Sequence, residues 1–193
     1  MQAGFSIELG SDDEALEFPW SADNGPRYYD LKRQPGLLVH IEEATRFPEL
    51  KEFLTAVNAS TSMVETAKCD AWFSDQINPE EEIFGVPCKF GSYVDLVLSD
   101  KPSRYSFPEH EKLARRLTEL LKHVPEIPAS TEFLVRRCYY HESSGEETRE
   151  GFYITFYLFG YGDDGRQARQ RWGIALKLVE NAVRQISGNN QNT

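Results

Sequence analysis

The same order of elements, a helix followed by a strand, a loop and a second strand, can be traced twice along this chain. The word Phe-Pro-Glu opens both helices, at residues 47–49 and 107–109. A proline at a first helical position followed by an acidic residue favours a helix start. Further short words recur in the same order, among them Cys69 with Cys138. Colinear repeats of this kind indicate two tandem modules. The alternative is coincidence on a common rhythm of helices and strands.

Each module supplies an antiparallel hairpin and one covering helix. This predicts an α+β fold, an antiparallel sheet with helices on one face, in which two tandem α-β-β modules are related by a pseudo-two-fold duplication. A chain of 193 residues, 40% of them hydrophobic, suits one core and one domain. We therefore expect a single domain over residues 1–193 with four parts: N-terminal strands and an arm at 1–45, the first module at 46–100, the second module at 106–160 and a C-terminal helix at 164–187.

The C-terminal helix has the clearest periodicity in the chain. Its apolar stripe follows helical spacing through Ala168, Trp172, Ala175, Leu176, Val179, Ala182, Val183 and Ile186. This pattern predicts that Trp172 is a core residue. Asp163 or Asp164 is predicted to cap the helix. The glycine-rich stretch before the helix could instead cradle a phosphate, but the two carboxylates would repel that ligand.

The N-terminal part is predicted to contain three short strands. Alternation of apolar and polar residues indicates the first at residues 5–9 and the second at 16–20. Pro19 restricts the second to an edge strand or an extended arm. Residues 37–41 are interpreted as the third.

Alternation along the predicted strands also sorts side chains between two faces of the sheet. The helix-facing side is expected to hold Val94, Leu96, Leu98, Ile154, Phe156 and Leu158, with Leu134 and Cys138. The opposite face is expected to form a ligand or partner surface from Trp72, Tyr93, Arg137, Tyr139, Tyr153 and Tyr157. Arg136 then falls on the helix-facing side, a conflict that a bulge or a place at the sheet margin would resolve.

This aromatic face has three interpretations. Residues 21–36 or 76–90 could cover it, so that its rings form a second small core. A protein partner or a second copy of the chain could bind it, because amphipathic rings are favoured at such surfaces. It could also line a cleft for a small ligand.

The weak catalytic candidates are His141, Asp70 and Asp95, which the strand pattern places on that same face. An imidazole next to a carboxylate could carry out the acid–base chemistry of a small hydrolase or transferase. Cys138 and His141 have a C-x-x-H spacing, but residues i and i+3 of a strand point to opposite faces. We therefore expect no metal site and no cofactor.

Composition narrows the functional classes further. With 31 acidic and 21 basic residues, the net charge is −10, which argues against nucleic acids and anionic membranes as partners. No run of 18 apolar residues and no signal peptide are recognised, and three cysteines suit a reducing compartment, so a cytoplasmic location is expected.

The leading hypothesis is a non-catalytic interaction or regulatory module. It would use the aromatic sheet face, or the C-terminal helix, where Ile174 and Leu178 lie off the main stripe. Its partner would be another protein or a second copy of the chain.

Overall fold

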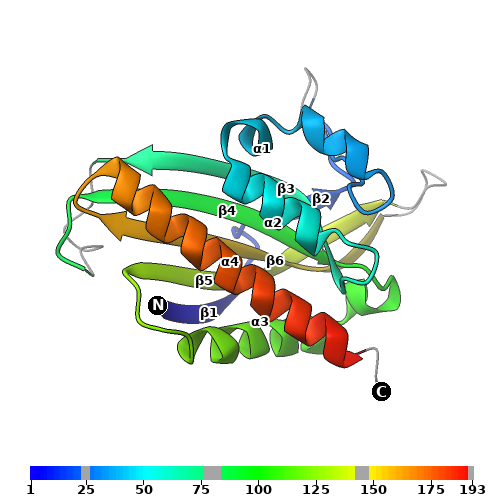
Figure 1. Ribbon diagram of the computed structural model, residues 1–193. Coiled ribbons are helices and arrows are strands. Elements are labelled where there is room, and N and C mark those ends of the chain that lie inside the picture. The colour runs from blue at the N-terminus through cyan, green and yellow to red at the C-terminus, as the bar shows by residue number, and fades with distance from the viewer. Residues whose placement is uncertain (23–26, 76–83, 142–147, 191–193) are drawn as a thin grey trace.

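The computed structural model describes residues 1–22, 27–75, 84–141 and 148–190 (Figure 1). The elements of these residues follow in the order β1 (Gln2–Glu8), β2 (Leu16–Phe18), the 3₁₀ helix η1 (Pro35–His40), α1 (Glu42–Arg46), α2 (Pro48–Val57), β3 (Val64–Ser74), β4 (Cys88–Leu98), the 3₁₀ helix η3 (Pro102–Tyr105), α3 (Phe107–Lys122), β5 (Ala129–His141), β6 (Thr148–Gly162) and α4 (Gly165–Asn190). The two Phe-Pro-Glu words open α2 and α3, as predicted.

The strands form one mixed, mostly antiparallel sheet in the order β1-β5-β6-β4-β3, with β2 also paired to β5. The pairs β3/β4, β4/β6 and β5/β6 are antiparallel. Both N-terminal strands run parallel to β5, so the expectation of a wholly antiparallel sheet is wrong at this edge. A parallel pair needs a long connection, and between β2 and β5 the described residues form η1, α1, α2, the β3–β4 hairpin, η3 and α3.

Helix α4 crosses the sheet and packs against β6 and β4 (Figure 1). The indole of Trp172 is fully buried, lies 4.7 Å from the Phe90 ring and donates a hydrogen bond from Nε1 to Ser92 Oγ at 2.8 Å. The main core joins residues of α2, α3 and α4 to the strand residues Val94, Leu96, Leu98, Ile154, Phe156 and Leu158. The apolar stripe of α4 and the apolar side chains of the strands therefore pack together in one hydrophobic core, and their burial stabilises the fold.

Glycine at position 160 lets α4 approach β6 closely. A β-carbon there would lie 2.2 Å from the Trp172 nitrogen and 2.4 Å from the Ala168 carbonyl oxygen. The helix starts where predicted, because Asp164 Oδ1 accepts a hydrogen bond from the Gln167 backbone N–H at 2.8 Å, which is an N-cap.

Residues 37–41 do not form the predicted strand. Pro35 instead opens the 3₁₀ helix η1, in which only Leu38 is buried. A run of five residues, apolar except for His40, is too short for periodicity to separate a strand from a helical turn, and the preceding Pro-Gly pair favours the turn.

The cysteines that the two-module pattern aligns do not occupy equivalent places. Cys69 lies opposite Val94 in β4, whereas Cys138 lies opposite Gly151 in β6. The shift between the two modules carries Val94 to Ile154. The counterpart of Cys69 should therefore lie opposite Ile154, but the residue there is Val135. The correspondence of these cysteines is therefore wrong.

Candidate functional site

One half of the sheet face opposite α4 is sealed by a second, smaller core. Its buried members are Leu16, Phe18, Val97, Cys138, Tyr140 and Tyr153. Trp20 and Tyr28 from the N-terminal arm and Tyr105 from η3 pack against them. Covering by residues 21–36 was one interpretation of the sequence. Among the described residues, those that cover this half are Leu16, Phe18, Trp20 and Tyr28. Most of the other candidate cover, residues 76–83, lies outside the described residues.

The other half of this face carries four half-buried aromatic side chains, Trp72, Tyr93, Tyr157 and Phe159, which we call the aromatic strip. The rings of Trp72 and Phe159 lie 6.1 Å apart, and those of Tyr93 and Tyr157 lie 6.0 Å apart. Gly91 allows the first contact, because a β-carbon there would lie 2.8 Å from the Phe159 ring. The strip is thus a set of mutually packed rings on three adjacent strands.

Charged groups surround the aromatic strip. Lys89 Nζ and the Arg136 guanidinium carbon lie 5.2 and 6.0 Å from ring centres of the strip. The Arg136 guanidinium is fixed by Glu8, at 2.8 Å from Nε to Oε2, and by Glu14, at 3.1 Å from Nη1 to Oε2. Asp70 is exposed beside Tyr93 on the neighbouring strand. The rim is therefore polar around an aromatic centre, as in many protein interfaces.

Half of the residues predicted for this face lie in the strip, namely Trp72, Tyr93 and Tyr157. Tyr153 lies on the same face but is fully buried in the second core. Arg137 and Tyr139 lie on the other face of β5, where Arg137 donates a hydrogen bond to the Gly10 carbonyl, so their assignment to the aromatic face is wrong. Phe159 was missed, although it follows Tyr157 at the strand period of two.

The misassignment in β5 has a simple cause. Phe133 and Val135 are the residues that point into the main core, and Leu134 points away from it. Arg136 therefore lies on the aromatic face, opposite Tyr153, and no bulge is needed to explain it. A one-residue error in register moves every side chain of a strand to the other face.

A carboxyl group lies buried among these side chains. Asp95 is 5% exposed and accepts a hydrogen bond from Thr155 Oγ1 at 2.6 Å. Burial raises the pKa of the Asp95 carboxyl to about 7, against the lowering effects of the Thr155 hydrogen bond and of Lys68 and Arg136, while Glu14 adds to the rise. Burial disfavours the charged form of a carboxyl group.

This carboxyl should make the stability of the fold depend on pH. Its pKa is higher in the folded protein than in the unfolded chain, so its contribution is present at low pH and is lost as the pH rises through about 7. Between about pH 5 and about pH 8 the free energy of unfolding of the wild type should fall relative to that of Asp95→Asn by roughly 2–3 kcal/mol. Denaturant unfolding of both proteins at both pH values measures this difference. Parallel pH profiles would contradict it.

The three catalytic candidates are not linked by hydrogen bonds in the described part of the chain. His141 pairs through Nε2 with Glu17 and through Nδ1 with Thr148 Oγ1 at 3.2 Å, and both ends of the His141–Glu17 pair are exposed. Asp95 pairs with Thr155 in the middle of the sheet, and Asp70 lies on the edge strand β3. His141 is on the other face of β5 from Cys138 and Tyr140, at the end of the strand.

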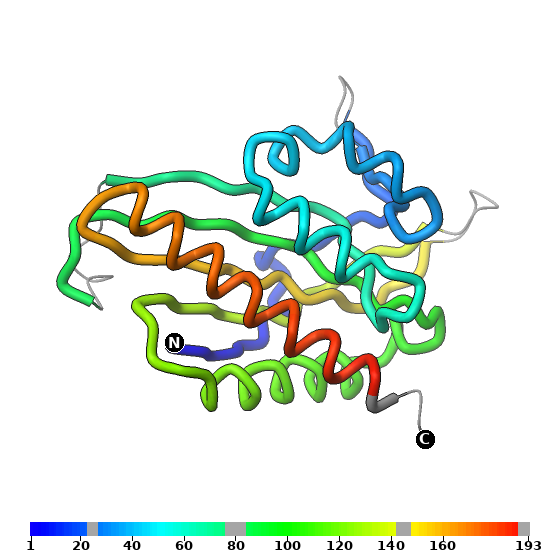
Figure 2. Tube along the Cα trace, in the orientation of Figure 1, coloured from blue at the N-terminus to red at the C-terminus, as the bar shows by residue number. Residues whose placement is uncertain are grey.

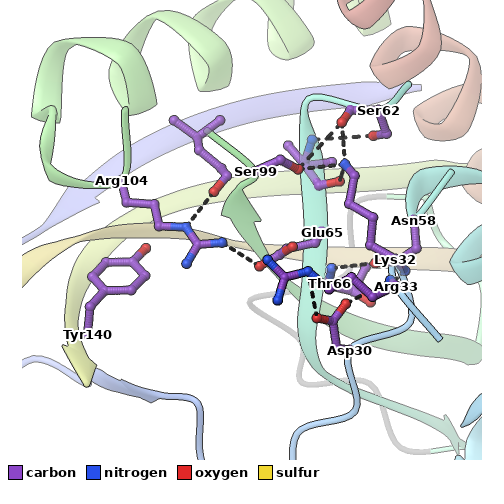
Figure 3. Close-up of polar contacts among 12 residues, drawn as sticks. Asp30, Lys32, Arg33, Asn58, Ser62, Glu65, Thr66, Ser99, Arg104 and Tyr140 are labelled. Atoms are coloured by element: carbon purple, nitrogen blue, oxygen red, sulfur yellow. Dashed lines mark hydrogen bonds and ion pairs between the residues drawn. The ribbon is translucent and has the colours of Figure 1, made fainter. Parts of the chain in front are cut away.

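His141 lines a cleft of about 300 Å³. Glu65, Ser99 and Arg104 line the same cleft and belong to a network of polar contacts (Figure 3). Arg104 donates from Nη2 to Glu65 Oε1 at 2.6 Å and from Nε to the Leu98 carbonyl at 2.8 Å. Lys32 Nζ donates to Ser99 Oγ at 2.6 Å and to the carbonyls of Ser62 and Val64. These bonds fasten the N-terminal arm and η3 to the ends of β3 and β4.

The cations of this network are therefore already used in holding the fold together. Burial lowers the pKa of the Lys32 ammonium and raises the pKa of the Glu65 carboxyl, and the neighbouring opposite charges counter both effects. Because Lys32 and the Nε and Nη2 groups of Arg104 donate to atoms of this chain, the network has fewer hydrogen-bond donors left for a ligand than its charge suggests.

Burial affects the thiols of Cys69 and Cys138. All three cysteines are free, and burial raises the pKa of the Cys138 thiol to about 12 and that of Cys69 further still. Thiols held protonated in this way are poor nucleophiles. Among these residues no group of three or more His, Cys, Asp and Glu side chains could hold a metal ion.

No helix within the described ranges is long and apolar enough to cross a membrane. Comparison with protein-family models, with curated proteins and with solved structures found no match to this chain.

Proposed function

We propose that this chain is a non-catalytic interaction module that binds a partner protein on the aromatic strip. The observation that supports this proposal is that the two halves of one sheet face differ in their exposure to solvent. The N-terminal arm seals one half of that face into a second core, whereas Trp72, Tyr93, Tyr157 and Phe159 stay half-exposed on the other half.

The strip has the physical properties of a binding centre. Trp and Tyr contribute a large apolar area together with a polar group, and they dominate the energetic centres of protein interfaces. These rings stand on paired strands and pack against each other, so that little conformational entropy remains to be lost when a partner orders them. The charged rim around them would favour one orientation of the partner.

Charge indicates what kind of partner fits. The chain carries a net charge of −10, and two copies would repel each other. A partner with an apolar centre and a basic periphery would instead be steered toward this acidic chain and would pair with the exposed Asp70 at the rim of the strip. We therefore propose a basic protein partner and not a second copy of the chain.

Site-directed photo-crosslinking in cells tests this surface. Tyr157 is replaced by a photo-crosslinking phenylalanine analogue, and Ile174, which is 46% exposed on α4, is replaced in the same way as a control on the competing surface. We expect a heterologous crosslinked protein from position 157 and not from position 174. Crosslinks only to a second copy, or only from position 174, would overturn the proposal, as would the absence of any crosslink from position 157.

The captured protein is then purified and titrated against variants. Trp72→Ala should weaken its binding roughly thirtyfold, about 2 kcal/mol, as expected for a central aromatic residue. Ile174→Ala should leave the dissociation constant unchanged, and a melting curve of each variant checks the fold. Affinity should also fall as salt rises, because the partner is basic. Equal binding by wild type and Trp72→Ala would contradict the assignment of the strip.

We also propose that the two α-β-β modules, with their helices on one face of the sheet, are a tandem duplication. The repeated Phe-Pro-Glu word at the starts of α2 and α3 supports this. The shift that carries Phe47 to Phe107 also carries Asp95 to Thr155, and these two residues lie directly opposite each other in β4 and β6, so a two-fold axis would pass between them.

A further inference from the structure

A second cleft lies at the edge of the sheet, between β3 and the segment that holds η1 and α1 (blue to cyan in Figure 2). It has a volume of about 330 Å³ and shares no residue with the aromatic strip. This volume is at the small end of the range for ligand pockets, and it suits a molecule with one ring system. The cleft combines rings and charged groups, whose arrangement indicates the class of ligand.

Rings held in place form walls of this cleft. Tyr29 and His40 are stacked, with ring centres 5.6 Å apart and planes inclined by 26°. Trp20 is fixed by a hydrogen bond of 2.8 Å from its Nε1 to the Ala67 carbonyl, and it also packs against the second core. Aromatic walls of this kind favour a planar ring by stacking.

Two cations line the cleft without an ion pair to a carboxylate of the described part of the chain, although Lys68 lies close enough to Asp95 to lower the pKa of that buried carboxyl. Lys68 Nζ lies 5.1 Å from the centre of the Trp20 ring, and the Arg27 guanidinium carbon lies 5.7 Å from the centre of the Tyr29 ring. In a chain with ten more acidic than basic residues, neither forms an ion pair with a described residue. The cleft thus presents positive charge beside its aromatic walls that no ion pair with a described residue holds in place.

The backbone of β3 positions one of these cations. The register passes from Thr66 opposite Leu96 to Cys69 opposite Val94, so Ala67 and Lys68 together stand opposite the single residue Asp95. This is a β-bulge, and bulges re-aim side chains next to binding sites. In a regular strand, the side chains of Ala67 and Lys68 would point to opposite faces of the sheet, so both could not line the cleft in this way.

The cleft also contains carboxylates, which restrict the ligand further. Glu42 and Glu43 contribute to its lining from the start of α1. They would repel a ligand that is negative throughout, and they can accept hydrogen bonds from its N–H or O–H groups. The preferred ligand therefore carries its negative charge at one end.

We propose that this cleft binds a small planar aromatic anion. Its ring lies against the Trp20 and Tyr29–His40 walls, and its acidic group is paired by Lys68 and Arg27. A carboxylate and a phosphate share this chemistry, so an aromatic carboxylic acid and a mononucleotide are both compatible with it. Guanidinium and ammonium groups bind either anion through charge-assisted hydrogen bonds.

Calorimetric titration of the full chain with two pairs of probes tests the proposal. Indole-3-acetate is compared with indole, and adenosine monophosphate with adenosine, so that each pair differs in its acidic group. We expect one or both anions to bind, and each bound anion to bind at least about tenfold more tightly than its neutral counterpart. The pair that binds identifies carboxylate or phosphate as the ligand group.

Variants show whether binding occurs in this cleft. Lys68→Gln and Arg27→Gln should each weaken the bound anion about tenfold and leave the melting temperature close to that of wild type. Lys51→Gln, on the exposed side of α2, is the matched control and should not change the affinity. Equal affinity for neutral and anionic probes, an unchanged affinity in Lys68→Gln, or no binding of any probe up to about 1 mM would overturn the proposal. None of these outcomes depends on the partner bound by the aromatic strip.

Discussion

Trp172→Ala is expected to lower the free energy of unfolding by about 3–5 kcal/mol, the usual cost of truncating a buried large aromatic residue. The side chain is fully buried, contacts the rings of Phe90 and Phe47, and donates a hydrogen bond to Ser92. Its removal leaves a cavity between α4 and the sheet and an unpaired buried hydroxyl. Equilibrium denaturation in urea, monitored by circular dichroism, measures the change.

Trp172→Phe separates these contributions. It retains much of the ring packing and loses the hydrogen bond to Ser92, so the loss of stability should be clearly smaller than in Trp172→Ala. A denaturation midpoint of Trp172→Ala close to that of wild type would show that α4 is not anchored to the sheet by this residue.

Gly160→Ala should be at least as damaging, with an expected loss of about 3 kcal/mol or more. The added carbon would lie 2.2 and 2.4 Å from backbone atoms of α4, which cannot move aside as the end of a flexible side chain can. The helix would have to lift away from β6, and the packing around Trp172 would open with it. Thermal and urea denaturation should both show the loss.

Gly188→Ala is the matched control for this substitution. Gly188 lies in α4 with no atom within 4 Å of its prospective β-carbon. Alanine should therefore stabilise the protein slightly, by about 0.5–1 kcal/mol at most, through its higher helix propensity. If both glycine variants behaved alike, close approach would not be the reason for glycine at position 160.

The local sequence predicted most of the elements because their signals are strong and short in range. Proline followed by glutamate marked the starts of α2 and α3, and one continuous stripe marked α4. The direction of β1 and β2 could not be predicted, because their partner β5 is far away along the chain and no local pattern records it. The strand predicted at residues 37–41 failed for a different reason, because an apolar run this short has no clear period.

The face of a strand residue could be predicted where apolar and polar residues alternate regularly along the strand. In β4 and β6 the apolar positions are regular, and Tyr93 and Tyr157 were correctly placed. In β5 the run Phe133 to Val135 is apolar at every position, so either alternation fitted it, and the choice put Arg137 and Tyr139 on the wrong face. The edge cleft was not foreseen, because it depends on the β3 bulge and on tertiary contacts of Trp20, which leave no local pattern.

The parallel pairing of the N-terminal strands has a consequence for how the chain folds. Gln2 pairs with Ser130 and Leu16 with Cys138, so the arm can find its partner only after nearly three quarters of the chain have left the ribosome. Contacts between such distant residues carry a large loop-closure entropy and slow folding. The arm should therefore dock last, onto a β5–β6 hairpin that has already formed, and until then the second core remains open to solvent.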